Sequence, residues 1–139
     1  MPPRPPSYED VVAALRAQQP TASPAPDLDG VTDQLARAVA AADEPDRRAL
    51  RLACRLLAQR LAARVPGRTV EVRVPPYAAV QCVAGPRHTR GTPPNVVEAD
   101  PLAWVRLATG GLAWADGVRD GRVRASGERS DLSGLLPLT

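Results

Sequence analysis

The chain has 139 residues, enough for one domain with a substantial core and too few for two cores. All 18 basic residues are arginine, and the apolar residues include no Ile or Phe, so the arginine content reflects genomic base composition. The formal net charge of +3 is unevenly spread, because residues 45–94 hold 10 arginines against 2 acids.

Features that report on the cellular compartment are few. No apolar stretch approaches the roughly 18 residues that a membrane span requires, and the start of the chain lacks the apolar segment of a secretion signal. Neither Cys54 nor Cys82 stands in a Cys-x-x-Cys motif. We therefore expect a reduced, soluble, cytoplasmic protein without a transmembrane segment.

Residues 1–26 are predicted to form a proline-rich lead-in, a short helix and a linker. Ser7 and Asp10 have the spacing of a capping box at the start of a helix over residues 8–18. The run QPTASPAPD that follows favours a linker, because three prolines and small polar residues sustain neither helix nor strand. We expect the first helix to be a loosely attached arm and residues 27–139 to form a single domain.

Two further helices are expected before any strand. One covers residues 31–42, and a longer one begins after Pro45 and ends before Pro66 and Gly67. At 100° per residue, the apolar side chains of the longer helix fall on one stripe, comprising Leu50, Cys54, Leu57 and Leu61. The opposite arc carries Arg47, Arg48, Arg51 and Arg55.

The arginine arc of this helix has three interpretations. It is solvated or paired with acids of the preceding segment, it makes transient contact with an anionic membrane surface, or it binds nucleic acid. The acids available for pairing are Asp27, Asp29, Asp33, Asp43 and Glu44. Four aromatic residues in the whole chain and acidic flanking regions argue against nucleic acid, and we favour solvation or pairing.

After Gly67 the apolar period changes from 3.6 to 2. Strands are predicted over residues 70–74, 77–84, 95–99 and 122–126. Residues 85–94, GPRHTRGTPP, are too rich in Gly and Pro for a central strand and are predicted to be a loop.

This loop concentrates the side chains most suited to binding an anion. They are Arg87, His88, Arg90 and Thr92. A guanidinium fork matches carboxylate or phosphate, and glycine-flanked backbone can add N–H donors. The alternative is a simple turn in which the arginines bond backbone carbonyls or Glu98. The sequence leaves both open.

Catalysis and metal binding have weaker support. His88 is the only histidine, with a side chain suited to acid–base chemistry, but no serine or cysteine stands in a nucleophile-elbow motif. One histidine and two distant cysteines do not form a zinc-ligand pattern. We expect no catalytic residue, no metal and no cofactor.

The C-terminal half has a specific order of elements. Asp100 and Pro101 start a helix that Gly110 and Gly111 end, and a second short helix precedes Gly121. A half-buried strand then closes at Gly127.

This order resembles the C-terminal half of sterol carrier protein domains. The residues that match are Asp100, Leu107, Gly110, Gly121, Val123, Ala125, Gly127 and Glu128. The likeness covers residues 69–138 and is closest to small bacterial sterol-carrier-like proteins. It implies an α+β fold in which helices cover a curved sheet of about 4–5 strands around an apolar ligand cavity. The loop at residues 85–94, where the family usually has another strand, and the short end after Asp131 depart from the pattern.

The resemblance implies a non-catalytic carrier for a lipid or other apolar small molecule, whose anionic head group lies near Arg87 and Arg90. Further ligand-binding residues would then be Tyr77, Trp104, Leu107, Trp114 and Val118. The two tryptophans would otherwise fill the core. The main alternative function is a protein interaction module that kept the fold without the cavity, and a small enzyme based on His88 is the third.

Overall fold

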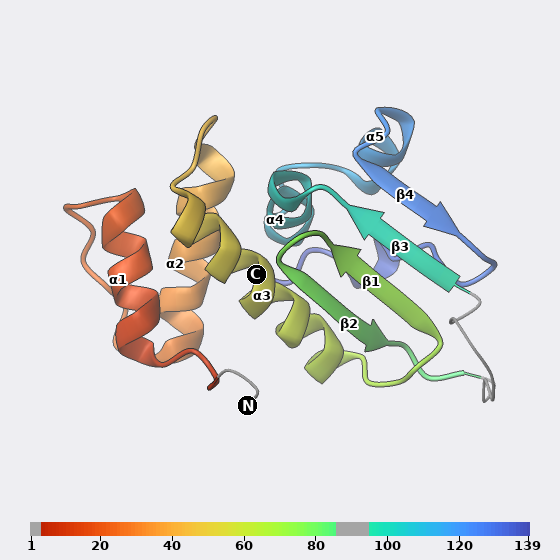
Figure 1. Cartoon of the computed structure of the whole chain (residues 1–139), viewed down its shortest axis with the longest axis horizontal. Helices are drawn as coiled ribbons and strands as arrows, with labels where there is room; N and C mark the ends of the chain where they lie inside the picture. Colours follow the sequence, from red (N-terminus) through yellow and green to blue (C-terminus); the bar gives the residue numbers. More distant parts are fainter. Residues whose placement is uncertain (1–3, 86–94) are drawn as a thin grey trace.

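Three helices precede the sheet and two more lie between its last strands. The computed structural model describes residues 4–85 and 95–139. Its elements are α1 (Tyr8–Gln18), α2 (Leu28–Ala41), α3 (Arg47–Arg64), β1 (Val70–Val74), β2 (Ala78–Cys82), β3 (Asn95–Ala99), α4 (Pro101–Thr109), α5 (Trp114–Arg119), β4 (Val123–Ser126) and the 3-10 helix η1 (Ser133–Leu135). The α+β class and the order of helices before strands are confirmed (Figure 1).

The four strands that the structure describes form a mixed, open sheet in the order β2-β1-β3-β4. β1 pairs antiparallel with β2 and parallel with β3, and β3 pairs antiparallel with β4. Val70, Val72 and Val74 are buried while Glu71 and Arg73 are half-buried, which is the alternation that the sequence predicts for β1. The predicted loop at residues 85–94 lies almost entirely outside the described residues.

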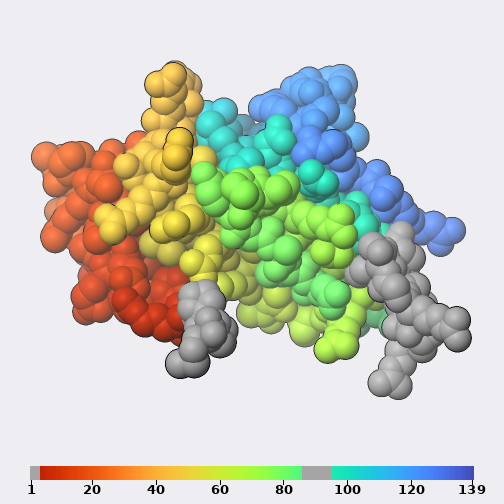
Figure 2. Space-filling view, in the orientation of Figure 1, coloured from red at the N-terminus to blue at the C-terminus, as the bar shows by residue number. Residues whose placement is uncertain are grey.

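Helix α3 is the central element of the molecule. It contacts α1, α2, α4 and β2. Figure 1 shows α1 and α2 on one side of α3 and the sheet on the other, and in Figure 2 the yellow surface of α3 separates the red surface of α1 from the green surface of β1 and β2. Asp46 caps this helix by accepting a hydrogen bond from the Ala49 N–H at 2.9 Å.

Helix α1 belongs to the core, so the expectation of a loosely attached arm is wrong. Val11 and Leu15 are fully buried in the same hydrophobic cluster as the sheet residue Val72. The irregular segment between α1 and α2 is also held, because the Tyr8 hydroxyl donates to the Ala25 carbonyl at 2.8 Å. The division of the chain between residues 26 and 27 stays a prediction.

The N-termini of two other helices differ from what the sequence predicts. Helix α2 starts three residues earlier than expected because Asp27 caps it, accepting from the Gly30 N–H at 2.6 Å. Asp100 stands at the N-terminus of α4 as predicted, but its carboxylate accepts from Arg124 at 3.1 Å and makes no capping bond.

The C-terminal segment packs back onto the helices. The Leu138 N–H donates to the Ala108 carbonyl at 2.7 Å, and the Leu138 carbonyl accepts from Arg64 at 2.7 Å. The side chains of Leu132 and Leu138 are buried in the core. The short helical turn expected at this end is η1.

Candidate ligand-binding site

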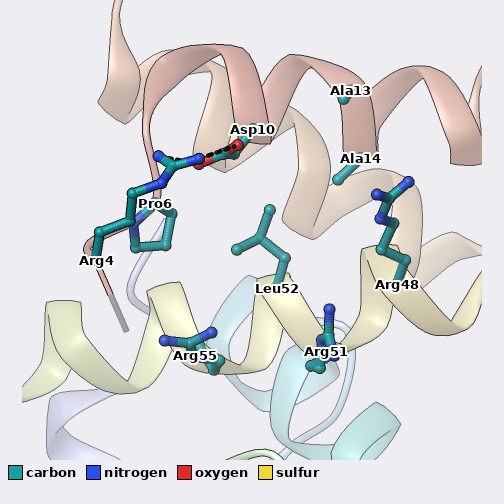
Figure 3. Close-up of a pocket in the computed structure, with 9 residues that line it drawn as sticks. All are labelled: Arg4, Pro6, Asp10, Ala13, Ala14, Arg48, Arg51, Leu52 and Arg55. Carbon is teal, nitrogen blue, oxygen red and sulfur yellow. Dashed lines mark hydrogen bonds and ion pairs between the residues drawn. The ribbon is translucent and has the colours of Figure 1, made fainter. Parts of the chain in front are cut away.

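A hollow of about 270 Å³ between α1 and α3, which we call the arginine hollow, is lined by four arginines (Figure 3). Helix α3 supplies three arginines because positions separated by three and four residues share one helix face. The lining consists of Arg4, Arg48, Arg51 and Arg55, the acid Asp10, and the apolar residues Pro6, Ala13, Ala14 and Leu52.

The only carboxylate in this lining is already engaged. Asp10 accepts hydrogen bonds from the Arg4 guanidinium at 3.1 and 3.4 Å and from the Ser7 backbone N–H at 2.9 Å. The backbone hydrogen bond from Ser7, followed by that from the Ser7 side chain, holds the pKa of Asp10 below its ordinary value. Asp10 is therefore ionised at neutral pH and fixes Arg4 at the rim.

The other three arginines lack an acidic partner among residues 4–85 and 95–139. In that part of the chain, Arg48, Arg51 and Arg55 form neither an ion pair nor a side-chain hydrogen bond. The helical acids expected to pair with this arc are used elsewhere, since Asp29 and Asp33 both pair with Arg60. Arg48 and Arg51 are exposed and Arg55 is half-buried.

A second hollow, of about 190 Å³, lies where α3 meets the edge strand β2, and we call it the helix–sheet hollow. Its lining consists of Arg55, Ala58, Gln59, Tyr77, Ala78, Ala79 and Val80. Tyr77 is one of the ligand residues expected from the sequence, and its side chain is half-buried. Arg55 borders both hollows.

The other expected ligand residues lie in different places. Trp104 and Leu107 are buried in the core, and the Trp104 indole N–H donates to the Cys54 carbonyl at 3.2 Å. Trp114 is half-buried at the edge of the core and Val118 is 42% exposed on α5. None of these four lines the arginine hollow or the helix–sheet hollow.

The expected anion-binding loop cannot be compared with these hollows. Arg87, His88, Arg90 and Thr92 lie outside the described residues, so their assignment as ligand residues stays a prediction. What sequence reasoning missed is the contribution of Arg4 and Asp10. The capping box and the arginine arc were both visible in the sequence, but no local signal shows that α1 faces α3.

Both cysteines are buried as thiols. Burial raises the pKa of Cys54 to about 12 and that of Cys82 to about 11, and the Cys54 thiol donates to the Pro101 carbonyl at 3.5 Å. These environments disfavour the thiolate that a nucleophilic cysteine requires.

We expect both thiols to resist Ellman's reagent in the folded protein at about pH 8, where an unperturbed cysteine is partly ionised. In urea both should react completely, because unfolding removes the burial that raises their pKa values. The absorbance of the released nitrothiobenzoate measures the rate. Rapid reaction of one thiol in the native protein would show that its surroundings open.

Metal and membrane features were also sought in the described part of the chain. There, no group of three or more His, Cys, Asp or Glu side chains is placed to hold a metal ion. Among the helices of the same residues, none has the length and apolar character needed to cross a membrane.

Comparison with known proteins identifies a family for the C-terminal two thirds of the chain. The family described as "Bacterial SCP ortholog" matches residues 46–138. The match begins at Asp46, the cap of α3, and extends through the sheet to the C-terminal segment, while α1 and α2 precede it. No curated protein matches the chain. The chain belongs to the family of bacterial SCP orthologues.

Proposed function

We propose that the protein is a non-catalytic carrier that binds an apolar or amphiphilic small molecule. Membership of the bacterial SCP family suggests a carrier role for such molecules. The structural observation that carries the proposal is the helix–sheet hollow, which opens where the helical layer meets the sheet edge.

This hollow has both polar and apolar lining groups. Val80 and the ring of Tyr77 are half-buried and provide apolar contact, whereas Ala58 is buried beneath them. Arg55 and Gln59 add polar groups to the same lining. A guanidinium group can pair with the carboxylate or phosphate of a bound amphiphile while its apolar part contacts the alanines and valine.

The volume limits what this hollow holds by itself. Drug-sized ligands usually occupy at least about 300 Å³, whereas this hollow offers about 190 Å³. Part of a long acyl chain would therefore extend beyond it. We retain Arg87, His88, Arg90 and Thr92 in the proposal as residues that contact the ligand head group.

Native mass spectrometry of the freshly purified protein, with analysis of an organic extract, tests this function. We expect additional mass that matches an extracted amphiphile. A clean protein mass that does not change after incubation with fatty acids and phospholipids would contradict the carrier function and favour the protein interaction module.

A substitution tests the position of the ligand. We expect Tyr77→Ala to weaken palmitate binding about two- to threefold, because the apolar surface that this hollow offers is small and the Tyr77 ring contributes to it. Isothermal titration calorimetry measures the dissociation constant. Leu28→Ala is the control, since Leu28 is a 43% exposed apolar residue of α2 that does not line this hollow. Unchanged affinity in a folded Tyr77→Ala protein would move the ligand away from the helix–sheet hollow.

A further inference from the structure

We propose that the arginine hollow is a binding site for a phosphate group. This site goes beyond the carrier function, because Arg55 is the one residue that it shares with the helix–sheet hollow. It stands whether or not an apolar molecule occupies that hollow. Figure 3 shows the arginine side chains surrounding Leu52, with α1 on the opposite side. The lining thus combines charge at the rim with apolar contact at the centre.

The number of guanidinium groups indicates a multiply charged anion. Arg48, Arg51 and Arg55 lie within two turns of one helix, and within the described residues no carboxylate pairs with them. Arg51 is three residues from Arg48 and four from Arg55, and like charges at these spacings on a helix repel each other. A phosphate dianion relieves this repulsion more fully than a single carboxylate does.

Geometry also favours phosphate. Each guanidinium presents a planar fork of N–H donors, and phosphate offers several oxygens that can accept from more than one fork at once. Arg4 approaches from the segment before α1, so the hollow has donors from two segments of the chain. Leu52 and Ala14 add apolar surface to the lining, next to which charge-assisted hydrogen bonds are stronger than in bulk water.

Arg4 lies at the rim of the hollow. Its largely exposed side chain pairs with Asp10, whose carboxylate also accepts a hydrogen bond from the Ser7 N–H. The ion pair brings the Arg4 guanidinium to the side of the hollow that faces α3. Helix α1 lies before the segment shared with the family, so the complete hollow depends on the N-terminal part of this chain.

A phosphate group that binds here can come from a phospholipid head group or from a soluble phosphate compound. Calorimetric titration with pyrophosphate at constant ionic strength tests the soluble source. Vesicles of phosphatidylcholine with and without phosphatidic acid test the lipid source by cosedimentation. Either result supports the site, provided that binding depends on the arginines of the hollow.

We expect Arg51→Gln and Arg48→Gln each to weaken binding about tenfold, the usual consequence of losing one charge-assisted pair. Arg48 and Arg51 line only the arginine hollow, so their substitution tests this site alone. Arg55 is not substituted because it also lines the helix–sheet hollow. Arg47→Gln is the matched control, as it removes the same charge from the same helix at a residue outside the lining. Its affinity should equal that of the unmodified protein.

Two results would overturn the proposal. One is the absence of saturable binding to both pyrophosphate and phosphatidic acid vesicles. The other is an equal loss of binding in Arg47→Gln and Arg51→Gln, which would show diffuse attraction to a basic helix. Circular dichroism confirms that the variants are folded. Palmitate binding by Arg51→Gln is measured as well, because unchanged palmitate binding shows that a loss of phosphate binding is not a failure of the carrier function.

Discussion

Replacing Trp104 by alanine is expected to lower the free energy of unfolding by about 3–5 kcal/mol. The Trp104 side chain is completely buried on α4, a helix that contacts α2 and α3, and its indole N–H donates to the Cys54 carbonyl of α3 at 3.2 Å. Truncation removes the largest buried side chain in the described part of the chain and leaves a cavity that its neighbours fill only in part. Urea denaturation followed by circular dichroism measures the loss.

The Trp104→Phe variant separates packing from hydrogen bonding. It retains an aromatic ring and loses the indole N–H, so we expect a smaller loss, on the order of 1–2 kcal/mol. A nearly unchanged urea midpoint for Trp104→Ala would mean that the ring borders an empty cavity. That outcome would favour the ligand-lining role that the family resemblance implies over the core-filling role.

Replacing Gly67 by alanine should produce the second large loss, about 2–4 kcal/mol. Gly67 joins α3 to β1 with a φ of +150°, and an added Cβ would lie 2.0 Å from the Val83 carbonyl oxygen. The backbone at Val83 is held by two hydrogen bonds and cannot easily move. The Val83 N–H donates to the Val65 carbonyl at 2.8 Å, and the Val83 carbonyl accepts from the Thr69 N–H at 3.1 Å. Thermal or urea unfolding measures the effect.

Two other glycines provide the controls. Gly121 has a φ of +77° and open space around an added Cβ, so Gly121→Ala should show only the conformational cost of about 1–2 kcal/mol. Gly134 has open space, and its φ lies outside the positive region, so Gly134→Ala should be close to neutral. Equal losses at Gly67 and Gly121 would contradict a steric explanation for Gly67.

The two hollows lie along α3 and differ in their relation to the family segment. The helix–sheet hollow lies within the segment that the bacterial SCP family shares, whereas the arginine hollow also requires α1. Arg55 borders both, so a phosphorylated amphiphile could contact the two hollows through one side chain. Measuring palmitate and pyrophosphate together would reveal such coupling as a change in one affinity caused by the other ligand.

Local sequence determined the secondary structure with good accuracy. The 3.6-residue period between Asp46 and Pro66 predicted α3, and the alternation of valines after Thr69 predicted β1 with its bounds. The order of glycines in the C-terminal half pointed to the family that the comparison shows. These features are readable because caps, glycine turns and apolar periods act between residues close in the chain.

Only the tertiary structure decided how these elements meet. The composition of residues 19–27 indicates a linker, yet Val11 and Leu15 are buried because α2 and α3 cover them. The Asp100 carboxylate accepts a hydrogen bond from Arg124 and does not cap α4, because the pairing of β4 with β3 brings Arg124 beside it. The arginine arc was visible in the sequence, but its conversion into a hollow requires α1 to pack against α3. Such contacts join residues far apart in the chain, and packing of the whole core determines them rather than any local pattern.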